Sequence, residues 1–225
     1  MYLSRLTLNQ LSAQVRAELA HPYEMHRTLS RGFPKDTFNK TRNDGECSGV
    51  LFRVDESPRD HRIVVLVQSQ VAPDWTYLND KRDVRGHAYL LQPPESKLLE
   101  LKLAAGQTFA FRLHANPTKR LGKSAGEKKG KRVGIRNEEK QFEWLQRKAE
   151  QGGFRVVRAM VSRKDRIKDN PKEGDDRSSL DFLAAQFDGV LLVRDPDLLI
   201  KAVRSGIGSA KGLGFGLLSL APVRG

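Results

Sequence analysis

Alternating and helical spacings of apolar residues divide the chain into two successive groups of elements. Residues 2–9 alternate as a strand does, and two helical stretches follow, in which Ser12 can cap the first and Pro22 suits the first turn of the second. The first group is expected to hold strands at 2–9, 50–54, 62–70 and 88–92, and helices at 12–20, 22–31 and near Pro73. Its order is strand, helix, strand, strand, helix, strand.

A similar order returns after Pro93 and Pro94, which cannot continue the interior of a sheet and therefore indicate a junction. The second group is expected to hold strands at 98–103, 108–115, 154–161, 180–193 and 215–221, and helices at 138–151 and 196–205. The repeated β-α-β-β-α-β order predicts an α+β protein with tandem ferredoxin-like (RRM-like) domains at residues 1–94 and 95–225.

The charge balance favours a polyanionic partner. The chain carries 40 Lys and Arg against 27 Asp and Glu, a net charge of +13 with a pI near 10.0. Neither an amphipathic basic helix nor a lipidation signal points to a membrane, and no apolar stretch reaches transmembrane length. We therefore expect a nucleic acid as partner and no membrane association.

Two segments concentrate the positive charge. Residues 117–136 hold eight Lys and Arg against Glu127 alone, which predicts a mobile basic loop, with Lys119 and Arg120 placed to contact phosphates. The second runs from residue 155 to 168 and predicts a positive β-hairpin. Strand alternation there would place Arg155 and Arg163 on one face, opposite Arg158, Lys164, Arg166 and Lys168. The alternative for both segments is that the charge serves solubility alone.

A glycine-rich segment lies between the last predicted helix and the last strand. Glycine occupies positions 206, 208, 212, 214 and 216, with Lys211 the only charged residue among them. Its order of helix before strand excludes a dinucleotide-binding motif, which requires the reverse. Glycines this dense suit close approach of the backbone to a phosphate chain, or a tight turn needed only for packing.

Metal and cofactor sites have no support in the sequence. No two of the five histidines stand at the i, i+4 spacing of a helical zinc site, and no cluster of carboxylates offers a two-metal cage. The single cysteine, Cys47, excludes a disulfide framework and a thiolate cluster, and fits a reducing cytoplasm. We expect neither a metal nor a small-molecule cofactor.

Five stretches together resemble the CasE family of CRISPR repeat-processing endoribonucleases. They are YLSRLTLN, HPYEMHRTLSR, FAFRLHANPTKR, EWLQRKAEQGGFR and GIGSAKGLGFGLLSLAP. The resemblance covers nearly the whole chain and implies recognition of a CRISPR repeat RNA hairpin. It also implies metal-independent cleavage at the 3′ base of the stem, which leaves 5′-hydroxyl and 2′,3′-cyclic phosphate ends. The guide RNA would then stay bound among the other Cascade subunits in the cytoplasm.

The same resemblance implies site residues. His26 falls on a catalytic position of the family, as general base or general acid, and Tyr23 lies three residues earlier on the same helical face. We expect the imidazole to lie near the glycine-rich segment. The expected RNA-binding residues are Arg27, Arg31, Lys119, Arg120, Arg158, Arg163, Arg166, Gly208, Lys211, Gly212 and Gly214.

Other functions remain open from the residues alone. Without the resemblance, His26 reads more readily as a surface or structural histidine. A non-catalytic RNA-binding subunit of a ribonucleoprotein complex would need the same fold and charge, because binding requires only neutralised phosphates. A DNA-binding protein is a third alternative.

Overall fold

The computed structural model describes residues 1–35, 49–57, 60–121, 130, 132–169 and 180–223. Cys47 and residues 122–129 and 131 of the predicted basic loop lie outside these ranges. Contacts divide the chain into two compact units, Met1–Leu101 with Lys211–Gly214, and Lys102–Ala210 with Phe215–Gly225. The first unit thus runs past the predicted boundary at residue 94 and includes part of the glycine-rich segment.

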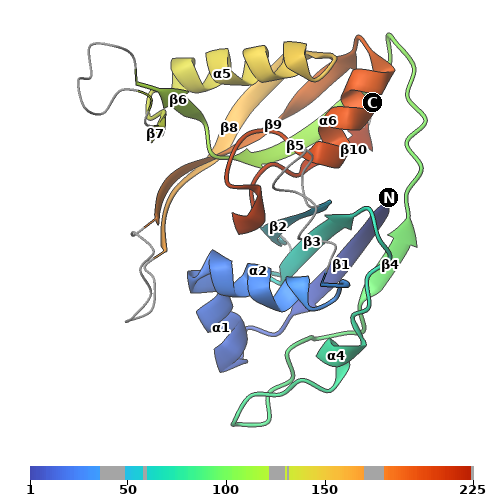
Figure 1. The fold of residues 1–225 in the computed structure, drawn as a ribbon, viewed down its shortest axis with the longest axis vertical. Coiled ribbons are helices and arrows are strands. Elements are labelled where there is room, and N and C mark those ends of the chain that lie inside the picture. Colours follow the sequence, from blue (N-terminus) through green and yellow to red (C-terminus); the bar gives the residue numbers. More distant parts are fainter. Residues whose placement is uncertain (36–48, 58–59, 122–129, 131, 170–179, 224–225) are drawn as a thin grey trace. The chain divides into compact units, whose positions relative to one another are not determined.

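The first unit is built on a four-stranded antiparallel sheet in the order β2-β3-β1-β4 (Figure 1). Its strands are β1 (Tyr2–Leu8), β2 (Val50–Glu56), β3 (Ile63–Ser69) and β4 (Glu95–Leu98). The first strand pairs with both β3 and β4. This arrangement interleaves two crossover units, as the ferredoxin-like fold does.

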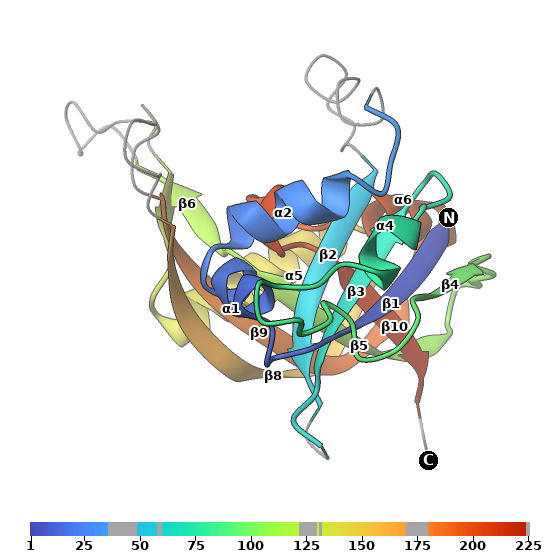
Figure 2. The same cartoon turned by 90° about the horizontal axis from the view of Figure 1, so that it is seen from below.

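Three helices cover one face of this sheet (Figure 2). They are α1 (Ala13–Ala20), α2 (Pro22–Ser30) and α4 (Thr76–Asn79). Ser12 caps α1 as predicted, since its side chain accepts a hydrogen bond from the Val15 N–H. The shared core draws residues from every helix and from the three longer strands: Leu6, Leu8, Val15, Met25, Leu29, Phe33, Val50, Phe52, Val65, Val67, Trp75, Leu78, Tyr89 and Leu90.

The second unit repeats the topology, with a four-stranded sheet in the order β10-β5-β9-β8. Its strands are β5 (Thr108–Ala115), β8 (Phe154–Asp169), β9 (Leu180–Val193) and β10 (Leu218–Pro222). All pairings are antiparallel. The α+β class and the tandem ferredoxin-like architecture are confirmed.

Helices α5 (Glu138–Gln151) and α6 (Pro196–Ser205) cover one face of the second sheet (Figure 1). Both have the predicted bounds. Trp144 of α5 stacks on Phe187 of β9 at 6.2 Å between ring centroids, and both side chains are buried. The stack fixes α5 on the sheet.

Three strand predictions were wrong. Residues 88–92 form isolated bridges, Leu8 with Leu90 and Arg82 with Ala88, although Tyr89 and Leu90 are buried. The fourth strand is instead β4, part of which had been assigned to a connecting strand at 98–103. The last strand begins at Leu218, because Gly216 has φ +88° and interrupts the extended backbone after Phe215.

The ends of the predicted mobile loop are ordered. Strands β6 (Thr118–Arg120) and β7 (Arg132–Gly134) pair with each other as a small antiparallel sheet. Residues 122–129 and Lys131 lie outside the described residues. Lys119 and Arg120 are therefore held on regular backbone.

The basic hairpin exists as β8 and β9, but the predicted face was wrong for Arg158. Two β-bulges in β8, between Val156 and Arg158 and between Val161 and Arg163, each add a residue and reverse the alternation. Arg158 pairs with Val190 and Arg163 with Gln186, so both lie on one face of the sheet, together with Arg155. Lys164 and Arg166 pair with Ala185 and Leu183, on the face that α5 covers.

Candidate functional site

Helix α2 presents His26 because its opposite side is fixed in the core. Met25 and Leu29 are buried, at 1% exposure each, and Thr28 is buried beside them. His26 is half-buried, and Arg27 is exposed. The packing thus fixes the rotation of the helix about its axis and leaves the imidazole on an accessible side.

The His26 ring lies against Gly212 of the short 3-10 helix η2 (Lys211–Leu213). A methyl group on Gly212 would lie 3.5 Å from His26 Cε1, 3.7 Å from Nδ1 and 3.8 Å from Nε2, which is van der Waals contact. Glycine therefore leaves one side of the imidazole uncovered by a side chain. This is the expected proximity of His26 to the glycine-rich segment.

Tyr23 and His26 are neighbours on α2, with ring centroids 6.5 Å apart and planes inclined by 39°. Burial lowers the pKa of His26 below its ordinary value of 6.5, because the charged imidazolium loses hydration. The neutral form therefore predominates at neutral pH. Neutral imidazole can accept a proton, which is the state a general base needs.

The two predicted phosphate contacts of α2 are both already engaged. Arg27 Nη1 lies 3.0 Å from Glu24 Oε2, one turn earlier, and its side chain is 61% exposed. Arg31 follows the helix and places its guanidinium carbon 5.2 Å from the centre of the Tyr77 ring. An exposed ion pair contributes only about 0.2–1 kcal/mol, so a phosphate can take over Arg27 at small cost.

A buried polar cluster connects α2 to α1 and to the segment around α4. Glu18 of α1, 4% exposed, accepts hydrogen bonds from Thr28 Oγ1 at 2.7 Å and from Tyr89 Oη at 2.5 Å. Lys81 Nζ lies 4.0 Å from Glu18 and 4.6 Å from the centre of the Tyr89 ring. Tyr77 Oη donates to the Thr28 carbonyl at 2.6 Å. Thr28 stands two residues after His26, so the cluster is coupled to the position of the imidazole.

The glycine-rich segment needs its glycines for backbone geometry. Gly206, Gly208, Gly214 and Gly216 have φ between +72° and +94°, the left-handed region that other residues occupy at a cost of about 1–2 kcal/mol. A methyl group on Gly214 would also lie 3.2 Å from the Phe52 ring. Gly212 has no positive φ, and a methyl group there would only reach van der Waals contact with the His26 ring, so neither the backbone nor a clash requires glycine at this position.

Lys119, Arg120 and Gly208 meet around one cavity of the second unit. The cavity has a volume of about 390 Å³. It is lined by Thr118, Lys119, Arg120, Arg132, Trp144, Arg147, Lys148, Gly208 and Ser209. Sequence reasoning missed Arg147 and Lys148 as site residues. Their only local signal was that two adjacent basic residues interrupt a helix that is otherwise rich in Glu and Gln.

The predicted RNA contacts on β8 do not share one face. Arg158 and Arg163 lie on the sheet face that carries Arg112 and Asp188, where Arg112 Nε donates to Asp188 Oδ1 at 2.6 Å. Arg166 lies on the other face, beside Lys164, which forms an ion pair with Glu138 of α5. All three arginines are exposed.

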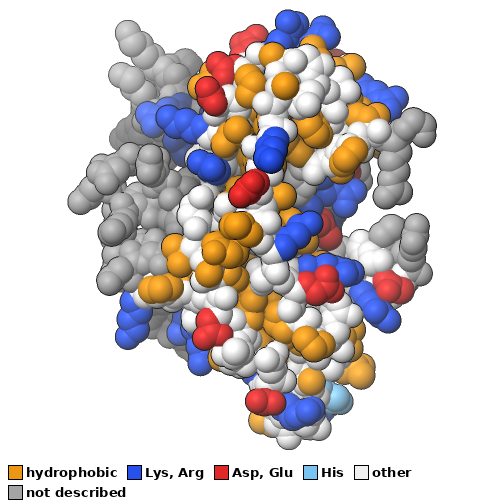
Figure 3. Space-filling model, turned by 90° about the vertical axis from the view of Figure 1, so that its right-hand side faces the viewer, with side chains coloured by type: hydrophobic (Ala, Val, Ile, Leu, Met, Phe, Trp, Pro, Cys, Tyr) orange, Lys and Arg blue, Asp and Glu red, His pale blue; other side chains and the backbone are white. Residues whose placement is uncertain are grey.

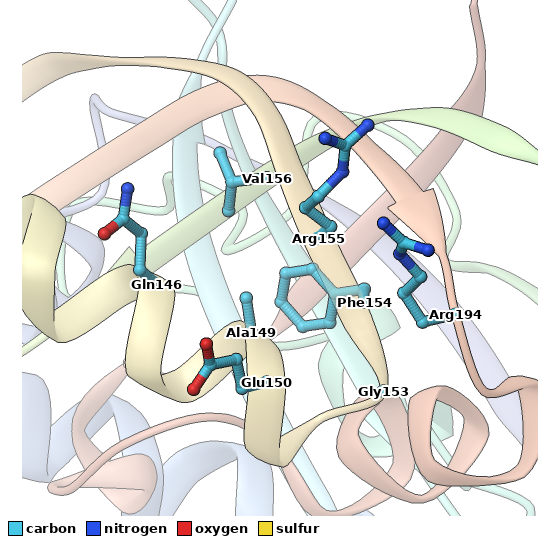
Figure 4. A pocket seen from close by; sticks show the side chains of 8 residues that line it. All are labelled: Gln146, Ala149, Glu150, Gly153, Phe154, Arg155, Val156 and Arg194. Carbon is cyan, nitrogen blue, oxygen red and sulfur yellow. The ribbon is translucent and has the colours of Figure 1, made fainter.

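A second cavity, of about 580 Å³, lies between α5 and the start of β8 (Figure 4). Figure 4 shows Arg155 and Arg194 on the strand side of the Phe154 ring, while Gln146 and Glu150 extend from α5. The lining of this cavity thus includes a carboxylate as well as two guanidinium groups. On the face drawn in Figure 3, Lys and Arg are likewise interspersed with Asp and Glu. Both surfaces suit a polyanion less well than the cavity around Gly208.

Two further features bear on possible functions. In the described part of the chain, no group of three or more His, Cys, Asp or Glu side chains is arranged to hold a metal ion. None of the helices in these residues is both long and apolar enough to cross a membrane.

Comparison with known proteins identifies the family. Residues 1–222 match the family model described as CRISPR associated protein. The chain is 35% identical to the CRISPR-associated endoribonuclease Cse3 of Thermus thermophilus and 33% identical to the Cascade subunit CasE of Escherichia coli, in each case over 99% of this chain and 100% of the relative.

A solved structure gives the same result. Thermus thermophilus Cse3 bound to an RNA representing a pre-cleavage complex superposes with a TM-score of 0.78 and 34% identity, over 98% of each chain. Sequence and fold agree along the whole length. The chain therefore belongs to the CRISPR-associated protein family that includes the Cse3 and CasE endoribonucleases.

Proposed function

We propose that this protein is a metal-independent endoribonuclease that cleaves precursor CRISPR RNA at the 3′ base of the repeat stem-loop. The observation that carries the proposal is the half-buried His26, held on α2 against Gly212 with Tyr23 beside it. Relatives that match along the whole chain are an endoribonuclease and a Cascade subunit. After cleavage the protein stays bound to the guide RNA among the other Cascade subunits, in the cytoplasm.

In this mechanism the 2′-hydroxyl of the RNA is the nucleophile. His26 removes its proton, the oxygen attacks the adjacent phosphorus, and the bond to the 5′-oxygen breaks. The products are a 2′,3′-cyclic phosphate and a 5′-hydroxyl, with the leaving oxygen taking a proton. The lowered pKa of His26 supports the role of base, because the neutral ring is then the major form at neutral pH.

The neighbouring residues supply orientation and charge. Tyr23 can hydrogen-bond the imidazole or the ribose, and Arg27 and Arg31 can bind phosphate oxygens, whose negative charge increases as the nucleophile attacks. Gly212 lies beside His26, and Lys211 precedes it in the same unit. Arg158, Arg163 and Arg166, on the exposed β8 strand, are proposed to bind the stem.

The proposal predicts that cleavage needs the 2′-hydroxyl and no divalent ion. Purified protein should cut a synthetic repeat RNA in EDTA, and a single 2′-deoxy substitution at the cleavage nucleotide should abolish cutting. Electrophoresis and mass spectrometry of the fragments would show whether a cyclic phosphate forms. Cleavage that requires added Mg²⁺, or that survives the deoxy substitution, would contradict the mechanism.

The pH dependence follows from the sign of the His26 shift. A base acts in its deprotonated form, so kcat/KM for RNA cleavage should rise with pH and level off, with a midpoint below 6.5. Stopped-time cleavage assays from acid to neutral pH would measure the midpoint. A rate that falls with rising pH over this range would assign His26 as the acid instead.

A further inference from the structure

The cavity around Gly208 gathers positive charge from three parts of the second unit. Arg120 belongs to β6, Arg132 to β7, and Arg147 and Lys148 to α5, which lie next to one another in Figure 1. Lys119 is the fifth cation. No acidic side chain is among the described lining residues. A concave surface with one sign of charge concentrates ligands of the opposite sign.

Two of these cations, Arg120 and Arg132, are neighbours of like charge and therefore repel each other. Arg120 and Arg132 are directly paired across β6 and β7, and like charges in that relation destabilise a strand pair. An anion bound between the two guanidinium groups would attract both of them and offset their repulsion. The strand pair therefore suits the binding of an anion.

The floor of the cavity is rigid and offers no aromatic surface to a base. Trp144 is 3% exposed and stacks on Phe187. Gly208 closes over the edge of its ring, since a methyl group there would lie 3.1 Å from Trp144 Cζ2, and φ is +94°. With the indole covered, the remaining donors are guanidinium, ammonium and hydroxyl groups, which can bind phosphate oxygens, and contacts to phosphate carry no sequence information.

We propose that this cavity binds phosphates of the RNA backbone outside the cleavage site, with Arg132, Arg147 and Lys148 as contacts besides Lys119 and Arg120. The proposal rests on the proposed function for the presence of RNA. A phosphodiester chain is preferred to a carboxylate-bearing protein because it carries a negative charge at every nucleotide, which matches five clustered cations with no acidic residue among the described lining. The cavity positions the RNA without reading its sequence.

The test measures affinity and its salt dependence with an RNA that cannot be cut. Repeat RNA with a 2′-deoxy cleavage nucleotide is titrated with wild type, Arg132→Gln, Arg147→Gln and the double variant at several salt concentrations. Each single change should weaken binding about tenfold and lower the slope of log K against log salt by about 1. The loss should be equal for a non-repeat RNA of the same length. Arg147 lies on an exposed helical surface, so its variant tests the proposal even if the β7 variant unfolds.

The matched control removes the same charge elsewhere in the second unit. Arg194→Gln with Lys201→Gln changes two exposed cations outside the cavity and should leave both the affinity and the slope near wild type. If the control variant loses as much RNA affinity as the cavity variants, the effect depends only on the net charge of the protein, and the proposal is overturned. So would variants that bind RNA normally but no longer assemble with purified Cascade subunits, since the occupant would then be protein. Because the RNA is uncleavable, a failed catalytic mechanism would leave these results unaffected.

Discussion

Replacement of His26 by alanine is expected to lower the single-turnover rate of RNA cleavage by about 10²- to 10⁴-fold, the usual contribution of a positioned general base. Affinity for the uncut RNA should stay close to wild type. His26 is half-buried against Gly212, and the cations that hold the phosphates remain in the variant. Cleavage assays with protein in excess, combined with fluorescence anisotropy on the deoxy-substituted RNA, would separate the two effects.

A second histidine, next to the start of α2, provides the control for this experiment. His21 precedes α2, is exposed, and makes no capping hydrogen bond to the helix with its side chain. His21→Ala removes an imidazole of equal size and should cleave at the wild-type rate. If His26→Ala also cleaves normally, the proposed base is wrong. If wild type binds the RNA tightly but never cuts it, the non-catalytic RNA-binding subunit becomes the better description.

Local patterns predicted most of the helices but not all of the strands. Residues 88–91 are a short apolar run because Tyr89 and Leu90 fill the core, yet their backbone forms only isolated bridges. The true edge strand, β4, is exposed along its length and carries no apolar signal, so its pairing with β1 depends on contacts distant in sequence. A short apolar run indicates burial, and a buried segment does not have to pair as a strand.

In the candidate site too, some contacts could be predicted from local sequence, and others depend on residues distant in the chain. Spacing along one helix is sufficient to bring Tyr23 and His26 together. The approach of Gly212 to His26 depends on how the end of the chain returns to the first unit, and only the family resemblance suggested it. The two bulges in β8 give no sequence signal, although they decide which face Arg158 and Arg166 occupy.

Sequence patterns also cannot tell which polar residue a helix buries. Glu18 lies within α1, a short helix with little amphipathic character, and its partners Thr28, Lys81 and Tyr89 come from three other segments. Burial raises the pKa of Tyr89, with the Glu18 carboxylate adding to the effect, so the phenol stays protonated and donates to that carboxylate. The cluster connects α1, α2 and the segment that follows α4.

Glu18→Ala is expected to destabilise the protein by about 3–5 kcal/mol, the usual cost of removing one partner of a buried charge pair. The change leaves Lys81 without its nearby carboxylate and removes the acceptor of Thr28 and Tyr89. Because Thr28 stands two residues from His26, cleavage by the remaining folded protein should fall as well. Urea unfolding followed by circular dichroism would measure the first effect, and single-turnover assays at low temperature the second.

The Gln variant and a surface control separate the charge from the hydrogen bonds. Glu18→Gln keeps an oxygen for Thr28 and gives Tyr89 an N–H to accept from, so it should lose less stability than Glu18→Ala and keep more of the cleavage rate. Glu143→Ala, on the exposed side of α5, should change the free energy of unfolding by no more than about 0.5 kcal/mol. Equal losses in the Ala and Gln variants would show that the charge next to Lys81 dominates. If Glu18→Ala unfolds like Glu143→Ala, the cluster does not hold α2, and the position of His26 must depend on the apolar core alone.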